Sequence, residues 1–168
     1  MELLRRGLLE GLTVAFAGDG ASAARDACAR LGAATPVLGA DLADEDTVAA
    51  AVAGMGAPDT LVCATGDVDG AFVATRAVAT TWIAAQRGGK VVLLAAAADN
   101  PQRAALENLA RTLSVEWARY DIRPAAILPA AATSPAEVAE LVAFLASPAG
   151  DYYSGCAFTL GAAAVAGA

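Results

Sequence analysis

Two aspartates, Asp67 and Asp99, are the residues whose side chains could carry out acid–base chemistry. Each comes shortly after an apolar run that is typical of a buried strand. If the two carboxylates flank one pocket, their pKa values can separate, so that one acts as an acid and the other as a base. Such a pair could catalyse isomerisation, dehydration or cyclisation without a nucleotide. A small cofactor-independent enzyme of this kind is therefore an alternative function.

The neighbours of Asp99 allow a structural interpretation of the same residues. Asp99 stands next to Asn100 and Pro101, a combination typical of the start of a helix, where an aspartate caps free backbone N–H groups. Arg103 follows four residues after Asp99. Its guanidinium could contact a ribose or a phosphate, but it does not lose its proton in proteins and cannot act as a base. The simpler interpretation makes Arg103 a solvated residue of the helix.

The residue inventory excludes several other kinds of site. The chain has no histidine, so histidine-based catalytic triads, histidine metal sites and imidazole proton shuttles are excluded. Its three cysteines, Cys28, Cys63 and Cys156, are odd in number and far apart, and they form no CxxC pair. We expect them to be buried apolar residues in a reducing compartment, and we expect no metal site.

The bulk composition indicates one globular domain. The 168 residues are 57% hydrophobic and 17% charged, with a net charge of −7. This balance argues against disorder and against a nucleic-acid surface, which needs clustered Lys and Arg. No apolar run is long enough to span a bilayer, and the first residues do not resemble a signal peptide. We therefore expect a cytoplasmic protein with a single domain over residues 1–168.

The elements that must position these residues alternate between strand and helix. This alternation predicts a parallel sheet covered by helices on both faces, a Rossmann-like doubly wound α/β fold. The expected strands are 12–17, 35–38, 59–64, 90–95, 122–128 and 152–160, and the expected helices are 21–31, 41–55, 69–87, 101–119 and one that begins at Pro135.

Three local signals sharpen this outline. Residues 134–137, Ser-Pro-Ala-Glu, form a capping box with proline at the first helical position. Pro124 interrupts the strand at 122–128 and leaves its pairing open. In the helix at 101–119, a one-sided apolar stripe recurs at helical spacing, formed by Leu106, Ala110, Leu113 and Trp117.

Five segments in order resemble the short-chain dehydrogenase/reductase family, especially its 3-oxoacyl-thioester reductases. Together they cover nearly the whole chain. The segment PDTLVCATG at 58–66 is similar to the family motif DxLVNNAG, GAFVATRAV at 70–78 is similar to the family helix that follows this motif, and GGKVVLLAA at 88–96 is similar to GGxIVNISS. The segment 104–129 is similar to AALENLTRSLAxELAxxGIRVNxIxPG. The segment 134–162 is similar to the closing motif xPEEVAxxVxFLASDxASYITGQxLxVDGG.

The resemblance implies a catalytic set that this chain does not retain. In the family, a tyrosine exchanges the proton at the carbonyl oxygen, a lysine lowers its pKa, a serine binds that oxygen, and an asparagine supports a water relay. By register, the tyrosine and lysine fall on Asp99 and Arg103, and the serine and asparagine fall on Ala96 and Asp67. None of the four residues is retained at its position, so all four positions are expected to be vestigial.

The family's cofactor positions are also altered. Its glycine-rich turn corresponds here to the shortened turn around Gly18 and Gly20, which contains the acidic Asp19. The resemblance places Asp41, Leu42 and Gly66 where the family lines the adenine and ribose. The segment between residues 36 and 41 is shortened, and residues 129–134 leave no room for a substrate lid. We therefore expect a reduced fold that has lost NAD(P).

The surviving elements match the surfaces through which family members associate. The helices at 69–87 and 101–119 resemble one family interface, and residues 135–160 resemble the other. The resemblance thus predicts a non-catalytic subunit that pairs with an intact, NAD(P)-bearing ketoreductase in a heterodimer or heterotetramer, with an acyl carrier protein as a further expected partner. The expected interface residues are Phe72, Trp82, Leu106, Leu113, Trp117, Tyr153 and Phe158.

Overall fold

Six parallel strands form the centre of the molecule in a computed structural model that describes residues 4–97 and 101–161. Within this part of the chain the strand order is β2-β1-β3-β4-β5-β6. The strands are β1 (Val14–Ala17), β2 (Val37–Leu38), β3 (Thr60–Cys63), β4 (Gly89–Leu94), β5 (Ile122–Pro129) and β6 (Ala157–Leu160). The helices are α1 (Ser22–Arg30), α2 (Glu45–Met55), α3 (Val68–Ala84), α4 (Pro101–Glu116) and α5 (Pro135–Ala146), with short 3₁₀ helices η1 (Ala118–Tyr120) and η2 (Pro148–Tyr152).

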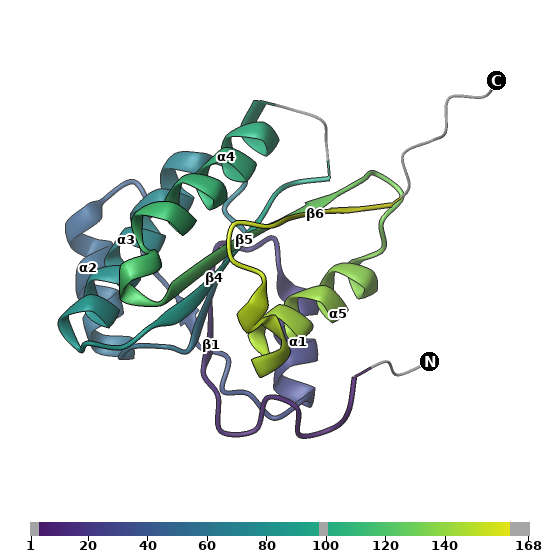
Figure 1. Cartoon of the computed structure of the whole chain (residues 1–168), viewed down its shortest axis with the longest axis horizontal. Helices are drawn as coiled ribbons and strands as arrows, with labels where there is room; N and C mark the ends of the chain where they lie inside the picture. The colour runs from purple at the N-terminus through teal and green to yellow at the C-terminus, as the bar shows by residue number, and fades with distance from the viewer. Residues whose placement is uncertain (1–3, 98–100, 162–168) are drawn as a thin grey trace.

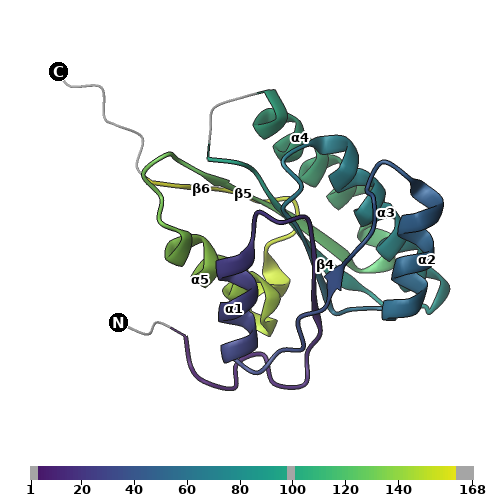
Figure 2. The same ribbon diagram turned by 180° about the vertical axis from the view of Figure 1, so that it is seen from behind.

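Helices cover both faces of the sheet. Figures 1 and 2 show α2, α3 and α4 on one face and α1 and α5 on the other. Each face has its own apolar cluster, one that includes Trp82 and Leu106 and one that includes Cys28 and Val142. The central strands are buried on both sides, which explains why they are apolar without alternation. The doubly wound α/β architecture expected from the sequence is confirmed.

The strand at Pro124 differs from the expectation that proline would interrupt it. β5 is continuous over Ile122–Pro129 and pairs with β4 on one side and β6 on the other. Ala126 donates its N–H toward the β6 side, to the carbonyl of Cys156. Pro124 has the same parity, so its missing N–H faces the same side, before β6 begins at Ala157. The proline therefore removes no ladder hydrogen bond.

Three other predicted boundaries were wrong. The final strand does not begin at residue 152, because Pro148–Tyr152 form η2, and β6 starts only at Ala157. The buried Ser147 caps η2, and its hydroxyl accepts a hydrogen bond from the N–H of Ala149. The second helix begins at Glu45 rather than residue 41, because Asp44 caps it while Asp41 accepts from Ala43 in the preceding turn. β2 has two residues rather than four.

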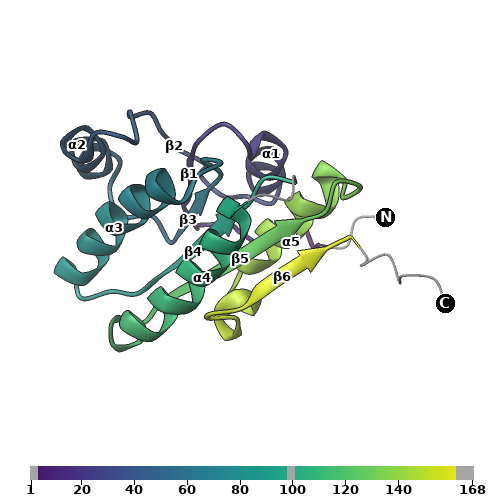
Figure 3. The same cartoon turned by 90° about the horizontal axis from the view of Figure 1, so that it is seen from above.

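The capping box at the start of α5 is confirmed. The Ser134 hydroxyl accepts from the Glu137 N–H at 3.2 Å, and the Glu137 carboxylate accepts from the Ser134 N–H at 2.8 Å. The edge of the sheet beyond β5 is β6, as Figure 3 shows from above. Among the described residues, none of the helices is both long and apolar enough to cross a membrane.

Candidate functional site

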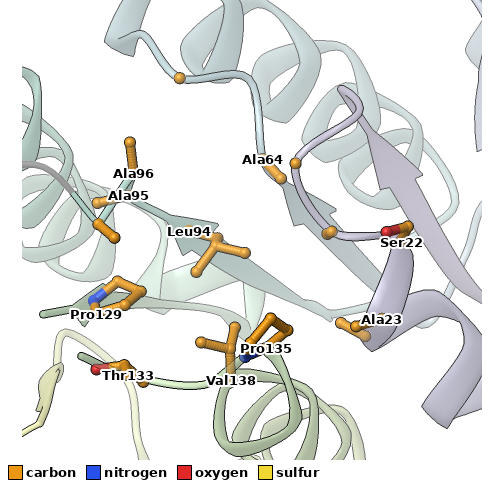
Figure 4. Close-up of a pocket in the computed structure, with 15 residues that line it drawn as sticks. Ser22, Ala23, Ala64, Leu94, Ala95, Ala96, Pro129, Thr133, Pro135 and Val138 are labelled. Carbon is orange, nitrogen blue, oxygen red and sulfur yellow. The ribbon is translucent and has the colours of Figure 1, made fainter. Parts of the chain in front are cut away.

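A cavity of about 340 Å³ lies beyond the carboxyl ends of β3, β4 and β5. The direction of winding reverses between β1 and β3, and in open α/β sheets ligands bind beside such a reversal, at the carboxyl ends of the strands. Ala64, Leu94 and Pro129 bring the three strand ends to the cavity wall. The first turns of α1 and α5 complete it. In Figure 4, Leu94, Val138 and Pro135 lie near one another, with Ser22 and Ala23 to one side and Ala95 and Ala96 to the other.

Among the described residues that line this cavity, none has an ionisable side chain. Most of its lining residues are alanine, glycine, proline, leucine or valine, and its polar side chains are those of Ser22 and Thr133. The Thr133 hydroxyl already donates to the carbonyl of Leu160 at 2.9 Å and accepts from the N–H of Ala130 at 2.9 Å. No residue of the described wall can therefore donate or accept a proton in a reaction near neutral pH.

The position that the family resemblance assigns to serine, Ala96, is on this wall. Ala96 is exposed and lines the cavity, and its methyl group can bind no carbonyl oxygen. Asp99, the position assigned to the tyrosine, lies outside the described residues. Its pairing with Asp67 therefore stays a prediction.

Asp67 takes part in the architecture of α3. It is the N-cap of that helix, and its Oδ1 accepts from the N–H of Gly70 at 2.7 Å. The neighbouring N–H, of Val68, is accepted by Gln102 of α4 at 2.9 Å. The start of α3 is therefore held by one side chain of its own and one from α4. Gln102 was not singled out from the sequence, because nothing local indicates a bond to a residue 34 positions away.

Arg103 is not the solvated helix residue that its sequence context favours. Its guanidinium is half-buried and donates to the carbonyl oxygens of Leu128 at 2.7 Å and Pro129 at 2.5 Å. These carbonyls belong to the end of β5, beside the cavity. Arg103 thus attaches the first turn of α4 to the last residues of β5, at the position where the resemblance expects a cofactor-binding lysine.

The glycines of the first turn serve close packing. Gly18 has a φ of +81°, and a Cβ there would lie 2.5 Å from the carbonyl oxygen of Ala64. At Gly20 a Cβ would lie 3.0 Å from the same oxygen. Both glycines therefore let the turn after β1 contact the segment after β3. Gly66 also has a positive φ, of +82°, but a Cβ there would meet nothing within 4 Å.

Carboxylates surround the hollows next to the cavity. A hollow of about 490 Å³ is lined by Asp41 and Leu42, two of the expected cofactor positions, together with Glu45, Asp67 and Asp69. A second, of about 560 Å³, is lined by Asp19, Asp41 and Leu42. The one basic residue on these linings is Arg25, in a hollow of about 160 Å³ that it shares with Asp19.

The acidic side chains around these hollows are an unfavourable charge environment for a pyrophosphate. A pyrophosphate needs backbone N–H groups and basic side chains, and it is repelled by carboxylates. Here the two glycines pack against Ala64, and acidic residues outnumber the single arginine. No group of three or more metal-binding side chains is found in the part of the chain that the structure describes.

Three of the seven expected interface residues are buried in the chain's own core, which corrects the sequence prediction. Trp82, Leu106 and Leu113 are 0%, 1% and 2% exposed. The Trp82 indole N–H donates to the carbonyl of Pro58 at 2.7 Å. Leu106, Ala110 and Leu113 of the apolar stripe on α4 are therefore buried in the chain's own core and cannot contact another subunit.

The remaining expected interface residues retain exposed surface. Phe72 on α3 is 37% exposed, and Trp117 is partly exposed. Tyr153 and Phe158 are also partly exposed and form an aromatic cluster with Phe144, with ring centroids 5.7 and 5.5 Å apart. Val115 on α4, not singled out from the sequence, is 79% exposed. The helical spacing in the sequence could have placed Val115 on the face opposite Leu106, because the two residues are half a turn apart around the helix.

Cys28 and Cys63 are not activated nucleophiles. Burial raises the pKa of Cys28 to about 12, and it raises the pKa of Cys63 to about 12 as well. Both thiols therefore stay protonated near neutral pH. The prediction of buried apolar cysteines is confirmed for these two, whereas Cys156 is partly exposed.

Comparison with known proteins identifies the fold. No protein-family model matches this sequence, and no curated protein is detectably similar to it in sequence. Solved structures are similar, among them a hydroxysteroid dehydrogenase from Escherichia coli, with a TM-score of 0.75, 19% identity, and coverage of 91% of this chain and 97% of that chain. A short-chain type dehydrogenase/reductase from Mycobacterium marinum has a TM-score of 0.78 and 18% identity, covering 90% of this chain and 94% of that chain.

A 3-ketoacyl-(acyl-carrier-protein) reductase from Brucella melitensis, solved in complex with NADH, is similar to the same degree. Its TM-score is 0.76 at 19% identity, over 90% of this chain and 97% of that chain. At such identities the likeness shows the fold. This chain has the Rossmann-like fold of short-chain dehydrogenases/reductases, as the five sequence motifs predicted.

Proposed function

We propose that this chain is a non-catalytic subunit that pairs with an intact short-chain dehydrogenase/reductase and stabilises or activates it. The partner would carry NAD(P) and reduce an acyl thioester or a polyketide-type carbonyl. One observation carries the proposal: a six-stranded sheet covered by helices on both faces is present, yet the cavity at the strand ends has no ionisable side chain on its described wall.

Carbonyl reduction needs a proton donor near the substrate oxygen and a group that stabilises the developing charge. Ala96 supplies neither, and Arg103 is engaged with the carbonyls of β5. Asp67 caps α3 and is an acceptor. These roles support the loss of chemistry rather than a change of substrate.

The outer faces of α3 and α4 are the surface we assign to the partner. Phe72 and Val115 are its large exposed apolar side chains. Two short side chains near Val115, those of Asn108 and Thr112, are also exposed. A pair of helices from a partner could therefore approach α3 and α4 closely. The Arg76 guanidinium lies 5.9 Å from the centre of the Phe72 ring and forms an ion pair with Glu45 at the edge of this surface.

Co-expression with an intact reductase encoded next to this chain would test the pairing. We expect one complex by size-exclusion chromatography with light scattering, with a mass equal to a sum of both subunits. Phe72→Glu and Val115→Glu should each dissociate it, whereas Val37→Glu, an exposed apolar position on β2 at the far edge of the sheet, should not. A stable homodimer that ignores the reductase would contradict the proposal.

Activity measurements address the loss of chemistry separately. The isolated chain should neither bind NADPH in isothermal titration nor oxidise it with an acyl-thioester substrate, whereas the complex should turn over faster than the reductase alone. Micromolar binding of NADPH to the isolated chain would instead support a surviving reductase.

A further inference from the structure

We propose that the free edge of the sheet at β2 binds an extended segment of a partner protein that carries lysine or arginine, and that this segment pairs with β2 as an added strand. Figure 3 shows β2 at the end of the sheet opposite β6. The pairing with a reductase uses the outer faces of α3 and α4 instead. Each of the two proposals therefore holds or fails without the other.

The backbone along β2 leaves hydrogen-bonding groups open at this edge. Pairing with β1 uses alternate residues, since the carbonyls of Ala34 and Pro36 accept from N–H groups of β1 at 2.8 and 2.9 Å. The N–H and C=O groups of the residues in between, Thr35 and Val37, point to the other side of the strand. Neither N–H forms a hydrogen bond with a residue in 4–97 or 101–161. Such a row of open groups is a template for another strand.

The side chains of β2 hold the strand in place and leave its edge uncovered. Leu38 is buried in the apolar cluster that includes Trp82, whereas Val37 is 46% exposed. A Cβ at Gly39, the next residue, would meet nothing within 4 Å. The described chain therefore leaves space beside this edge, and a strand placed there would cover the exposed part of Val37.

The charges beside Val37 favour a basic segment. Val37 lines the hollow of about 560 Å³ together with Asp19 and Asp41, and the hollow of about 160 Å³ together with Asp19 and Arg25. Within the described ranges, neither carboxylate forms an ion pair. Lysine or arginine on an added strand would lie near these two carboxylates, which attract a cation. A second copy of this chain would instead bring the same carboxylates toward each other, so pairing between identical edges is disfavoured.

A short synthetic peptide in which valine alternates with lysine is the probe, capped at both ends and labelled for fluorescence anisotropy. A copy that is N-methylated at every residue keeps the side chains and the charge but donates no backbone hydrogen bond. A copy with glutamate in place of lysine keeps the backbone and reverses the charge. These two peptides test the hydrogen bonds and the charge separately on the unaltered protein.

Substitutions place the binding at β2. Val37→Pro removes one open N–H, and an edge strand tolerates proline where the N–H does not pair within the sheet. Asp19→Asn removes one carboxylate charge from an exposed position. Asp26→Asn is the matched control, because Asp26 is exposed on α1 and lines neither hollow. Thermal melts confirm that each variant is folded.

We expect saturable binding of the lysine peptide to the wild-type chain. Affinity should fall at least about tenfold for the N-methylated and glutamate peptides and for Val37→Pro, at least about threefold for Asp19→Asn, and not at all for Asp26→Asn. The bound peptide should also slow hydrogen exchange at the Thr35 and Val37 amides, measured by NMR.

Several results would overturn the proposal. These are the absence of saturable binding, equal binding of the N-methylated or glutamate peptide, and unchanged binding to Val37→Pro or Asp19→Asn. A dimer of the isolated chain in analytical ultracentrifugation that Val37→Pro dissociates would assign this edge to a second copy instead.

Discussion

At the scale of single residues, Arg103 shows how one position can lose a catalytic role and gain a structural one. Its two hydrogen bonds satisfy carbonyls at the end of β5, where Leu128 and Pro129 are buried. A buried carbonyl without a partner is unfavourable, and a charged donor makes a stronger bond than a neutral one. Replacing the expected lysine by arginine also lets one side chain reach two acceptors at once.

Removal of this guanidinium should therefore destabilise the fold. We expect Arg103→Met to lower the free energy of unfolding by about 1–3 kcal/mol, measured by urea denaturation. Arg111→Met is the matched control on the same helix, because its ion pair with Glu107 is exposed and should change stability by less than about 0.5 kcal/mol. Equal effects of the two substitutions would show that the bonds to β5 contribute little.

At the scale of elements, the two helices that point their first turns at the cavity differ in how those turns are satisfied. α5 has a complete capping box from Ser134 and Glu137. α1 begins after Ala21 with no side-chain cap and has no acidic residue in its first turn. This difference is local, so it could be predicted from the residues around each helix start.

The cap of α5 should make part of the stability depend on pH. Hydrogen bonds from the backbone and hydroxyl of Ser134 lower the pKa of the Glu137 carboxyl from its ordinary value of about 4.5. A lowered pKa in the folded state stabilises the protein above the unfolded value, and this stabilisation is lost as the pH falls through the folded value.

We therefore expect Glu137→Gln to lower the melting temperature near neutral pH and to have a smaller effect below about pH 4, measured by circular dichroism across the pH range. Glu140→Gln removes the same charge from the same helix, outside the capping box, and should lower the melting temperature less near neutral pH. A difference between wild type and Glu137→Gln that stays constant with pH would contradict this account.

At the scale of the whole molecule, burial separates the inner from the outer face of α4. Leu106 packs in the apolar cluster on one face of the sheet, whereas Val115 points away from it. The surface available to a partner is thus the face opposite the stripe that periodicity identifies. A one-sided apolar stripe indicates burial, but it does not say whether the chain's own sheet or another subunit covers it.

This assignment predicts unequal costs for truncating the two residues. Leu106→Ala should lower the free energy of unfolding by about 2–5 kcal/mol, because it leaves a cavity in the core. Val115→Ala should change it by less than about 0.5 kcal/mol in the isolated chain. Chemical denaturation of both variants measures the difference, and similar costs would place Leu106 on an accessible surface instead.

The sequence by itself determined the alternation of strands and helices, the turn after β1 and the capping box of α5. These features depend on residues a few positions apart, through apolar runs, glycine and cap residues. It also showed that the four positions matched to the family's catalytic set hold other residue types. The boundary of β6 was wrong because Ser147 starts a 3₁₀ helix, η2, before the strand, and that of α2 was wrong because Asp44 caps this helix.

Only the tertiary structure decided which side chains meet. The bonds of Arg103 join residues 25 and 26 positions apart, and the cavity needs three strand ends and two helix starts to come together. Such contacts follow from the order of strands in the sheet, which local patterns do not encode. For the same physical reason, the burial of Leu106 and the accommodation of Pro124 became evident only once β4, β5 and β6 were placed side by side.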